Sequence, residues 1–196
     1  MNETGENEIW TLGGRKIDFI SPTPSMIDMP SMAVSLANMS RFNGYTNGFY
    51  SVAQHSVIMS YWVEDLYEGS NMDLAKAAVL HDFGEAWIGE HVTSLKKHLK
   101  ISHLENKITR MIFEDHDIDP DLWNCAEIKE LDMILLNTEI RDLKSGYAPP
   151  NPEMCIPEDE VTINPQMPDS AYSNLKMRYN ALFPDRQITA AYRNLN

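Results

Sequence analysis

The chain has 196 residues, of which 43% are hydrophobic, a composition that suits one compact domain with a proper core. Its net charge of −13 argues against a long nucleic-acid partner, because binding to a phosphate polymer requires a basic face. The sequence has no run of about 18 apolar residues, and its N-terminus (MNETGENEIW) is too acidic for a secretory signal. We therefore expect a cytoplasmic protein without membrane contact, in which Cys125 and Cys155, which form no CxxC pair, are reduced thiols.

The first elements expected along the chain are a hairpin and a connector within residues 1–30. The short runs IWTL and RKIDF flank Gly13-Gly14, which predicts a two-residue turn and a β-hairpin over residues 9–19. This register places Trp10 opposite Ile17 across the ladder. The Pro- and Ser-rich stretch SPTPSMIDMP then predicts an irregular connector.

The rest of the chain has mostly helical spacing of apolar residues. Helices are expected over residues 31–39, 51–67 (with Ser51 as N-cap), part of 71–88, 102–117, 120–144 (with Pro120 in the first turn) and 169–183, with a short turn or helix at 93–99. Residues 41–48 predict a loop, and residues 146–168, which contain six prolines, predict a surface excursion. The expected fold is all-α, a helical bundle with a small N-terminal β-hairpin, in a single domain over residues 1–196.

His81-Asp82 is the first candidate for chemistry, because it directly follows the apolar run AKAAVL. Charged residues that emerge from a buried helix need a partner, and a divalent cation would accept one nitrogen and one oxygen ligand here. His55 and Asp132 are candidates for further ligands, since each lies in a largely apolar helical stretch. Taken alone, His55 favours the alternative of a satisfied core histidine. The alternative for Asp132 is a salt bridge to Lys129 or to another helix.

Acidic and basic residues near these positions suggest the remainder of a site. Glu85 would share a face with His81 and Asp82 on a continuing helix, where its carboxylate could orient a metal-bound water. Glu90 is a weaker candidate of the same kind. The candidates for binding an anionic substrate, each individually more typical of a surface charge, are Arg41, Lys96 and Lys129. The other histidines (His91, His98, His103 and His116) show no clear pattern.

In this order and at this spacing, His55, His81-Asp82 and Asp132 resemble the H…HD…D signature of the HD-domain phosphohydrolases. The segments HDFGEAWIGE (81–90) and RF…YSVAQHSV (41–57) are similar to those of the small bacterial 5′-deoxynucleotidase branch and its phage relatives. The resemblance covers residues 32–183. Phage relatives include dATP triphosphohydrolases, and the hairpin-like N-terminus and Pro-rich late loop look similar to theirs.

The resemblance implies an HD-domain bundle with a single metal centre. Its ligands would be His55, His81, Asp82 and Asp132, with Glu85 activating the attacking water. An N2O2 ligand set suits Zn²⁺, Co²⁺, Mn²⁺ or iron, with Mg²⁺ assisting at the substrate phosphates.

For substrate binding, the resemblance implies that Arg41, Lys96 and Lys129 contact phosphate and that Phe42 lies near the sugar or base. Family members often have Asp where this chain has Glu90 and Pro where it has Val92 and Ser94. These departures bear on the base pocket and the pose of the leaving phosphate and leave the expected metal site untouched. The resemblance also suggests a homo-oligomer, a dimer or higher.

The expected function is metal-dependent hydrolysis of a deoxynucleotide, with dATP as the preferred substrate and deoxyadenosine and triphosphate as products. The alternative is a broad 5′-deoxynucleotidase that acts on deoxynucleoside monophosphates. A non-catalytic nucleotide sensor would have lost a ligand or Glu85, and all five residues are present. A signalling phosphodiesterase usually carries extra histidines for a second metal, and only His91 is available for that role.

Overall fold

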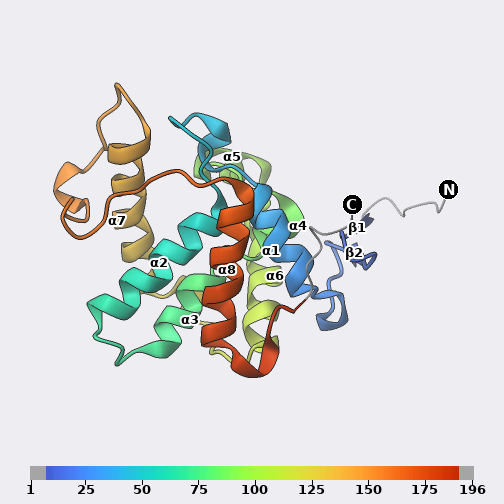
Figure 1. Cartoon of the computed structure of the whole chain (residues 1–196). Helices are drawn as coiled ribbons and strands as arrows, with labels where there is room; N and C mark the ends of the chain where they lie inside the picture. The colour runs from blue at the N-terminus through green and yellow to red at the C-terminus, as the bar shows by residue number, and fades with distance from the viewer. Residues whose placement is uncertain (1–7, 190–196) are drawn as a thin grey trace.

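The computed structural model describes residues 8–189, apart from the side chains of Thr93, Ser94 and Lys97. The chain forms an all-α bundle with a small antiparallel hairpin of β1 (Glu8–Trp10) and β2 (Lys16–Asp18) at one side (Figure 1). This confirms the expected fold class. The α-helices are α1 (Met29–Asn38), α2 (Val52–Leu66), α3 (Met72–Leu80), α4 (Glu85–Ile88), α5 (Thr93–Leu99), α6 (Ser102–Asp115), α7 (Ala126–Leu143) and α8 (Pro168–Leu182).

Helix α2 lies at the centre of the bundle and contacts α1, α3, α7 and α8. Its first turn is capped by Ser51, whose hydroxyl accepts a hydrogen bond from the Gln54 amide at 3.1 Å, as the sequence predicts. Because α2 is surrounded on several sides, even its polar residues are buried, and the side chain of His55 is fully inaccessible to solvent.

The hairpin differs from the predicted one in its turn and its register. Ile9 pairs with Ile17, and Trp10 pairs with Lys16, so the expected pairing of Trp10 with Ile17 is wrong. The cause is a longer turn: the Thr11 amide bonds the Arg15 carbonyl at 2.8 Å, which places three residues between them. This register turns Ile17 into the core and leaves Trp10 48% exposed.

Two helix boundaries also differ from the prediction. Pro120 does not open α7, because Cys125 has an extended backbone and caps the helix through its sulfur, which accepts from the Ile128 amide. Helix α3 ends at Leu80, and α4 begins after a stretch of turns. In this stretch the Phe83 and Glu85 amides bond carbonyls three residues earlier, so the chain stays tightly wound through His81 and Asp82.

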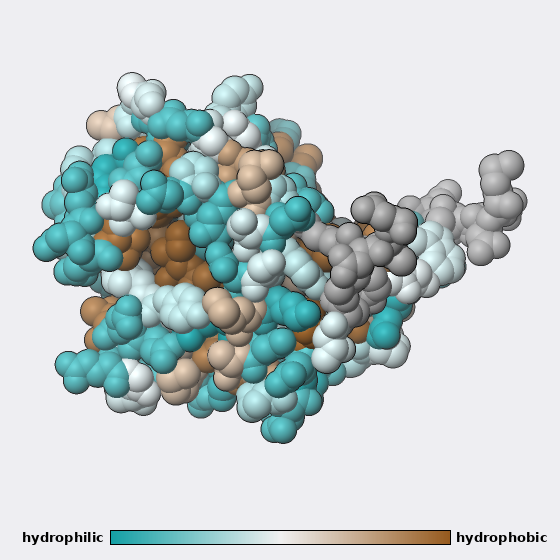
Figure 2. All heavy atoms as spheres, viewed as in Figure 1, coloured by the Kyte–Doolittle hydropathy of each residue, from teal (hydrophilic) through white to brown (hydrophobic). Residues whose placement is uncertain are grey.

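The Pro-rich segment contains no α-helix over residues 146–167, as predicted, and α8 begins at its last predicted residue, Pro168. The segment is attached to α7. Arg141 donates hydrogen bonds to the Ile156 and Val161 carbonyls, and Asp142 accepts one from the Ile163 amide at 2.7 Å. The segment borders an apolar hollow over α2 that is visible at the left of Figure 2. Its lining includes Trp62 and Leu66, and Leu66 is 54% exposed.

None of the described helices is both long and apolar enough to cross a membrane.

Candidate metal centre and active site

Four predicted ligands from three parts of the chain meet at one point. His55 comes from α2, His81 and Asp82 follow α3, and Asp132 comes from α7. The Nε2 atoms of His55 and His81 are 3.2 Å apart. Asp82 Oδ2 lies 3.3 Å from His81 Nε2, and Asp132 Oδ1 lies 3.3 Å from His55 Nε2.

The outer hydrogen bonds of both imidazoles determine which ring nitrogen faces this point. His81 Nδ1 lies 2.7 Å from the Ala78 carbonyl, which can only accept, so Nδ1 carries the hydrogen. His55 Nδ1 lies 2.5 Å from a Glu139 carboxylate oxygen and donates to it. In the neutral rings both Nε2 lone pairs therefore point toward each other and toward two carboxylates.

Such a convergence of lone pairs is repulsive unless a proton or a cation lies between them. Ligand atoms at metal bonds of about 2.1 Å are about 3.0 Å apart in octahedral and 3.4 Å apart in tetrahedral geometry, close to the spacings seen here. Asp132 has 45% of its side chain accessible, which leaves this side of the site open to solvent. The group His55, His81 and Asp132, together with Asp82, could therefore hold a metal ion with room for a further ligand.

Glu139 supports the metal site from behind and was missed by the sequence analysis. Its fully buried carboxylate accepts from His55, from the Tyr50 hydroxyl at 2.7 Å and from Arg41 Nη2 at 3.1 Å. Burial opposes its charge, but Arg41 and His55 outweigh burial and lower the pKa of Glu139. A signal was available, because Glu139 lies two helical turns after Asp132 on the same face of α7.

The same groups control the proton of His55. Burial and the Arg41 charge disfavour the imidazolium, yet Glu139 and Asp132 raise the pKa of His55 to about 10 in the metal-free protein. Burial likewise opposes the charge of Asp82, but His81, His55 and Arg41 lower its pKa well below the ordinary value. At neutral pH the site thus holds ionised carboxylates and a proton that a metal ion would displace.

We expect metal binding at pH 7.5 to release about one proton per ion, because His55 with a pKa of about 10 is protonated there and must lose Nε2–H. A pH-stat titration with Mn²⁺ measures the released proton, and uptake of the ion without proton release would contradict the assignment of His55 as a ligand.

The raised pKa of His55 also stabilises the metal-free fold. This contribution is fully present below pH 6.5, the ordinary pKa of histidine, and is lost as the pH rises toward 10. The melting temperature of protein in EDTA should therefore fall over this range, and that of metal-loaded protein should fall less.

Glu85 lies beside the predicted metal ligands in a second cluster. Lys96 Nζ donates to Glu85 Oε1 at 2.8 Å and to Glu105 Oε1 at 2.6 Å, and carboxylate oxygens of Asp82, Glu85 and Glu105 lie within 4.8 Å of one another. Glu85 Oε2 is buried and has no hydrogen-bond partner among the described residues. Burial and the Asp82 charge outweigh Lys96 and raise the pKa of Glu85, so its carboxylate binds a proton more strongly than an ordinary glutamate does.

Gly84 allows Glu85 to reach this position. A Cβ atom on Gly84 would lie 2.5 Å from the Thr109 hydroxyl of α6, so only glycine permits this approach of the turn to α6. The same α6 supplies Glu105, which the sequence analysis also missed because no pattern links it to residues 81–85.

A cavity of about 240 Å³ opens beside Asp82 and Asp132. Its lining contains most of the predicted substrate-binding and catalytic residues and comprises Arg41, Phe42, Asp82, Glu85, Glu90, His91, Val92, Lys96, Asp132 and Leu136. Glu90 has one buried carboxylate oxygen without a partner among the described residues, and burial raises its pKa. Lys129 is exposed and is not part of this lining.

Phe42 adopts an unusual backbone conformation at the cavity wall. Phe42, Asn43 and Gly44 all have positive φ. The value at Phe42 is 55°, in a region of backbone conformation that residues other than glycine rarely occupy. The turn holds the Phe42 ring 5.7 Å from the Arg41 guanidinium and 4.9 Å from Lys144 Nζ. Such local strain persists where the surroundings impose it and is common at binding sites.

None of the remaining four histidines belongs to the converging group, and only one of them lines the cavity beside it. His98 and His103 are exposed. His116 is buried and is bonded on one side to the Ile112 carbonyl and on the other to the Tyr179 hydroxyl, both at 2.7 Å. His91 lines the cavity, and its Nδ1 lies 3.0 Å from the Gly89 carbonyl.

No protein-family profile matches the sequence. The chain is similar to two bacterial proteins. It is 36% identical to the uncharacterized protein RCAP_rcc00048 of Rhodobacter capsulatus over 100 residues, which cover 48% of this chain and 49% of that protein. It is 32% identical to the uncharacterized protein YfdR of Escherichia coli K12 over 177 residues, which cover 89% of this chain and 94% of YfdR. With this identity over nearly the full length of both chains, the protein belongs to the same family as YfdR.

Proposed function

We propose that this protein is a metal-dependent phosphohydrolase of the HD-domain type that acts on deoxynucleotides. The observation that carries the proposal is the convergence of His55, His81, Asp82 and Asp132 with both imidazole Nε2 atoms fixed toward the same point. Glu139 and the Ala78 carbonyl orient the two imidazoles so that their Nε2 lone pairs face two carboxylates. A cluster that only stabilised the fold would have no use for this orientation, whereas a metal site requires it. A metal ion satisfies all four groups at once.

A divalent cation bound there acidifies a water molecule and neutralises phosphate charge. The donor set of two nitrogens and two oxygens suits Zn²⁺, Co²⁺, Mn²⁺ or iron, and Mg²⁺ would assist at the substrate phosphates. In the proposed site Glu85 accepts a proton from the attacking water. Arg41 and Lys96 line the same cavity, and their cationic groups would bind phosphate oxygens as charge moves to the leaving group.

Replacement of Glu85 by glutamine is expected to lower kcat by about 10²–10⁴, because the proton acceptor is lost. Metal content should stay at the wild-type value, since Glu85 lies outside the four proposed ligands. Turnover of purified protein and elemental analysis of the same sample measure both quantities. Glu130→Gln, an exposed site on α7, is the control, and an unchanged kcat in Glu85→Gln would exclude the proposed role.

Two substrates fit the proposal. The sequence resemblance favours dATP, with release of deoxyadenosine and triphosphate. A specific observation favours the second candidate, a 5′-deoxynucleotidase that acts on monophosphates. The cavity of about 240 Å³ is lined by four carboxylates (Asp82, Glu85, Glu90 and Asp132) and only two strong cations (Arg41 and Lys96). A divalent ion would bring this lining close to neutral, which suits one phosphate better than three.

The test is a product assay. Protein loaded with Mn²⁺, Co²⁺ or Zn²⁺, with Mg²⁺ added, is given each deoxynucleoside mono- and triphosphate separately, and the phosphorus products are resolved. Triphosphate from dATP alone would identify a dATP triphosphohydrolase, and orthophosphate from several monophosphates a broad 5′-deoxynucleotidase. Metal binding without turnover of any of these compounds would reject the proposal.

A further inference from the structure

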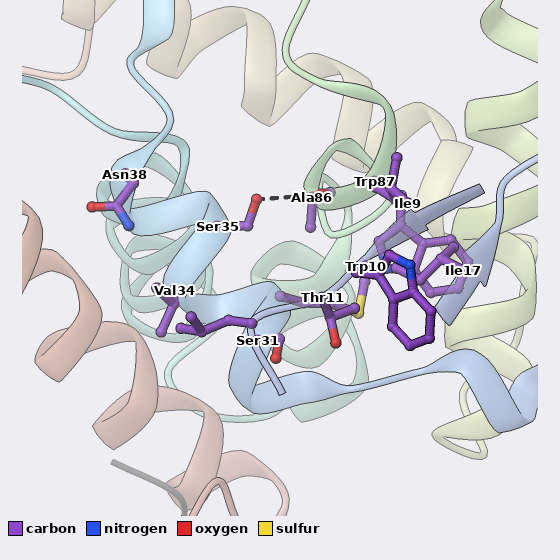
Figure 3. Close-up of a pocket in the computed structure, with 12 residues that line it drawn as sticks. Ile9, Trp10, Thr11, Ile17, Ser31, Val34, Ser35, Asn38, Ala86 and Trp87 are labelled. Carbon is purple, nitrogen blue, oxygen red and sulfur yellow. Dashed lines mark hydrogen bonds between the residues drawn. The ribbon is translucent and has the colours of Figure 1, made fainter. Parts of the chain in front are cut away.

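A second cavity, of about 340 Å³, lies between the hairpin, α1 and α4 (Figure 3). Figure 3 shows Trp10, Trp87, Ile9 and Ile17 together at one end and Asn38 at the other. Between them the Ser35 hydroxyl donates to the Ala86 carbonyl at 3.2 Å. The cavity volume is at the lower end of the range of about 300–1,000 Å³ that is typical of small-molecule sites, so it suits a compact ligand of one or two rings.

The lining of this cavity is electrically neutral. It is made up of Ile9, Trp10, Thr11, Leu12, Ile17, Ser31, Met32, Val34, Ser35, Asn38, Ala86 and Trp87, and among these described residues none is charged. This is unusual in a chain with a net charge of −13. Asp28, an acid bound to this lining, accepts from the hydroxyls of Ser31 at 2.6 Å and Thr11 at 3.1 Å. Among the described lining residues an ionic ligand would find no counter-charge.

Two indole rings give the cavity its chemical character. Trp10 is 48% exposed at the rim, whereas Trp87 is only 6% exposed. The indole Nε1 of Trp87 is buried and has no hydrogen-bond partner in the part of the chain that the structure describes. A buried donor without a partner is costly, at about 1–3 kcal/mol, and it is uncommon in folded proteins.

We propose that this cavity is a binding site for a small, neutral aromatic heterocycle that carries a hydrogen-bond acceptor. The two indoles offer flat apolar surfaces for its ring, and the acceptor would satisfy Trp87 Nε1–H. The Ser35 oxygen, whose hydrogen is directed to Ala86, offers an acceptor to a donor on the ligand. The site is separate from the proposed active site, because the two linings share no residue among those described.

The short helix α4 connects the two sites. Glu85 lines the cavity of the proposed active site, and the next two residues, Ala86 and Trp87, line the second cavity. A ligand that contacts Trp87 therefore acts on the element that holds Glu85. An effect of the ligand on turnover rests on the proposed function, whereas binding itself does not.

The test uses full-length, metal-free protein and the side-chain indole signals of its tryptophans in a ¹H–¹⁵N spectrum, assigned by Trp→Phe variants. Adenine, which is neutral at pH 7, is the probe; benzoate is the charged control and cyclohexanol the non-aromatic one. We expect adenine to shift the Trp87 and Trp10 signals saturably, with a dissociation constant on the order of 1 mM or tighter, while Trp62 and Trp123 stay in place. Benzoate and cyclohexanol should produce neither shift.

Variants locate the binding to the cavity. Trp87→Phe keeps an aromatic ring at this position and removes the Nε1–H donor. It should weaken adenine binding about tenfold, as measured from the Trp10 signal. Trp10→Ala removes an exposed rim residue and should abolish the saturable shift at Trp87, whereas Tyr147→Ala, an aromatic residue of similar exposure elsewhere, should leave it unchanged. Absence of a saturable shift in the wild type, an equal response to benzoate, or full binding in Trp10→Ala would overturn the proposal. Because no metal or turnover is involved, these results stand independently of the hydrolase assay.

Discussion

Replacement of His81 by alanine is expected to lower metal affinity and phosphohydrolase activity by at least about a hundredfold each. His81 contributes one of the four converging donor atoms, and its Nε2 lies within 3.3 Å of both His55 Nε2 and Asp82 Oδ2. Loss of residues that merely orient metal ligands typically costs 10–100-fold, so loss of a ligand should cost more. Equilibrium dialysis with Co²⁺ or Mn²⁺ and the product assay measure the two effects.

The matched control is His103→Ala. His103 is exposed, and its Nδ1 lies 2.8 Å from the carbonyl of Lys100, a residue outside the proposed site. Its removal should leave affinity, turnover and melting temperature within error of the wild type. If His81→Ala bound the metal and turned over substrate as well as this control, the proposed metal centre would be wrong.

Replacement of Glu139 by alanine should destabilise the protein by about 3–5 kcal/mol, because it leaves the buried guanidinium of Arg41 without its main partner. In a domain of this size the expected fall in melting temperature is roughly 10 °C. The milder Glu139→Gln should fold, keep a polar contact with Tyr50, and lower metal affinity about 10–100-fold, because His55 loses the charged acceptor that orients it. Thermal unfolding and equilibrium dialysis test the two variants.

Glu130, on the exposed side of the same helix, provides the comparison. Glu130→Ala and Glu130→Gln should change stability by less than about 0.5 kcal/mol. A Glu139→Ala protein as stable as Glu130→Ala would mean that the Arg41–Glu139–His55 contacts do not support the site.

The sequence by itself determined the fold class and offered candidates for the proposed metal site. Periodic apolar residues place most helix ends to within two or three residues, because the buried face of a helix repeats every 3.6 residues, but α7 begins at Ala126 and not at residue 120. His55, His81, Asp82 and Asp132 were candidates because each is a polar residue in or beside an apolar helical stretch, and the resemblance to HD-domain phosphohydrolases joined them into one ligand set. The residues of the hairpin turn were less informative. Gly13-Gly14 predicted a two-residue turn, but the turn has three residues, and Asp28 accepts hydrogen bonds from Thr11 at its start and from Ser31.

Only the tertiary structure decided how these residues act together. Glu139 shares a face of α7 with Asp132, but this spacing does not show that its carboxylate orients His55. No local pattern indicates that Glu105 of α6 would hold Lys96. Trp87 is buried and lines a cavity with residues of the hairpin and α1, because α3 ends at Leu80 and the chain turns before α4. Side-chain geometry between distant segments depends on packing, which sequence spacing does not encode, so both the orientation of the metal site and the second cavity appear only when the helices are assembled.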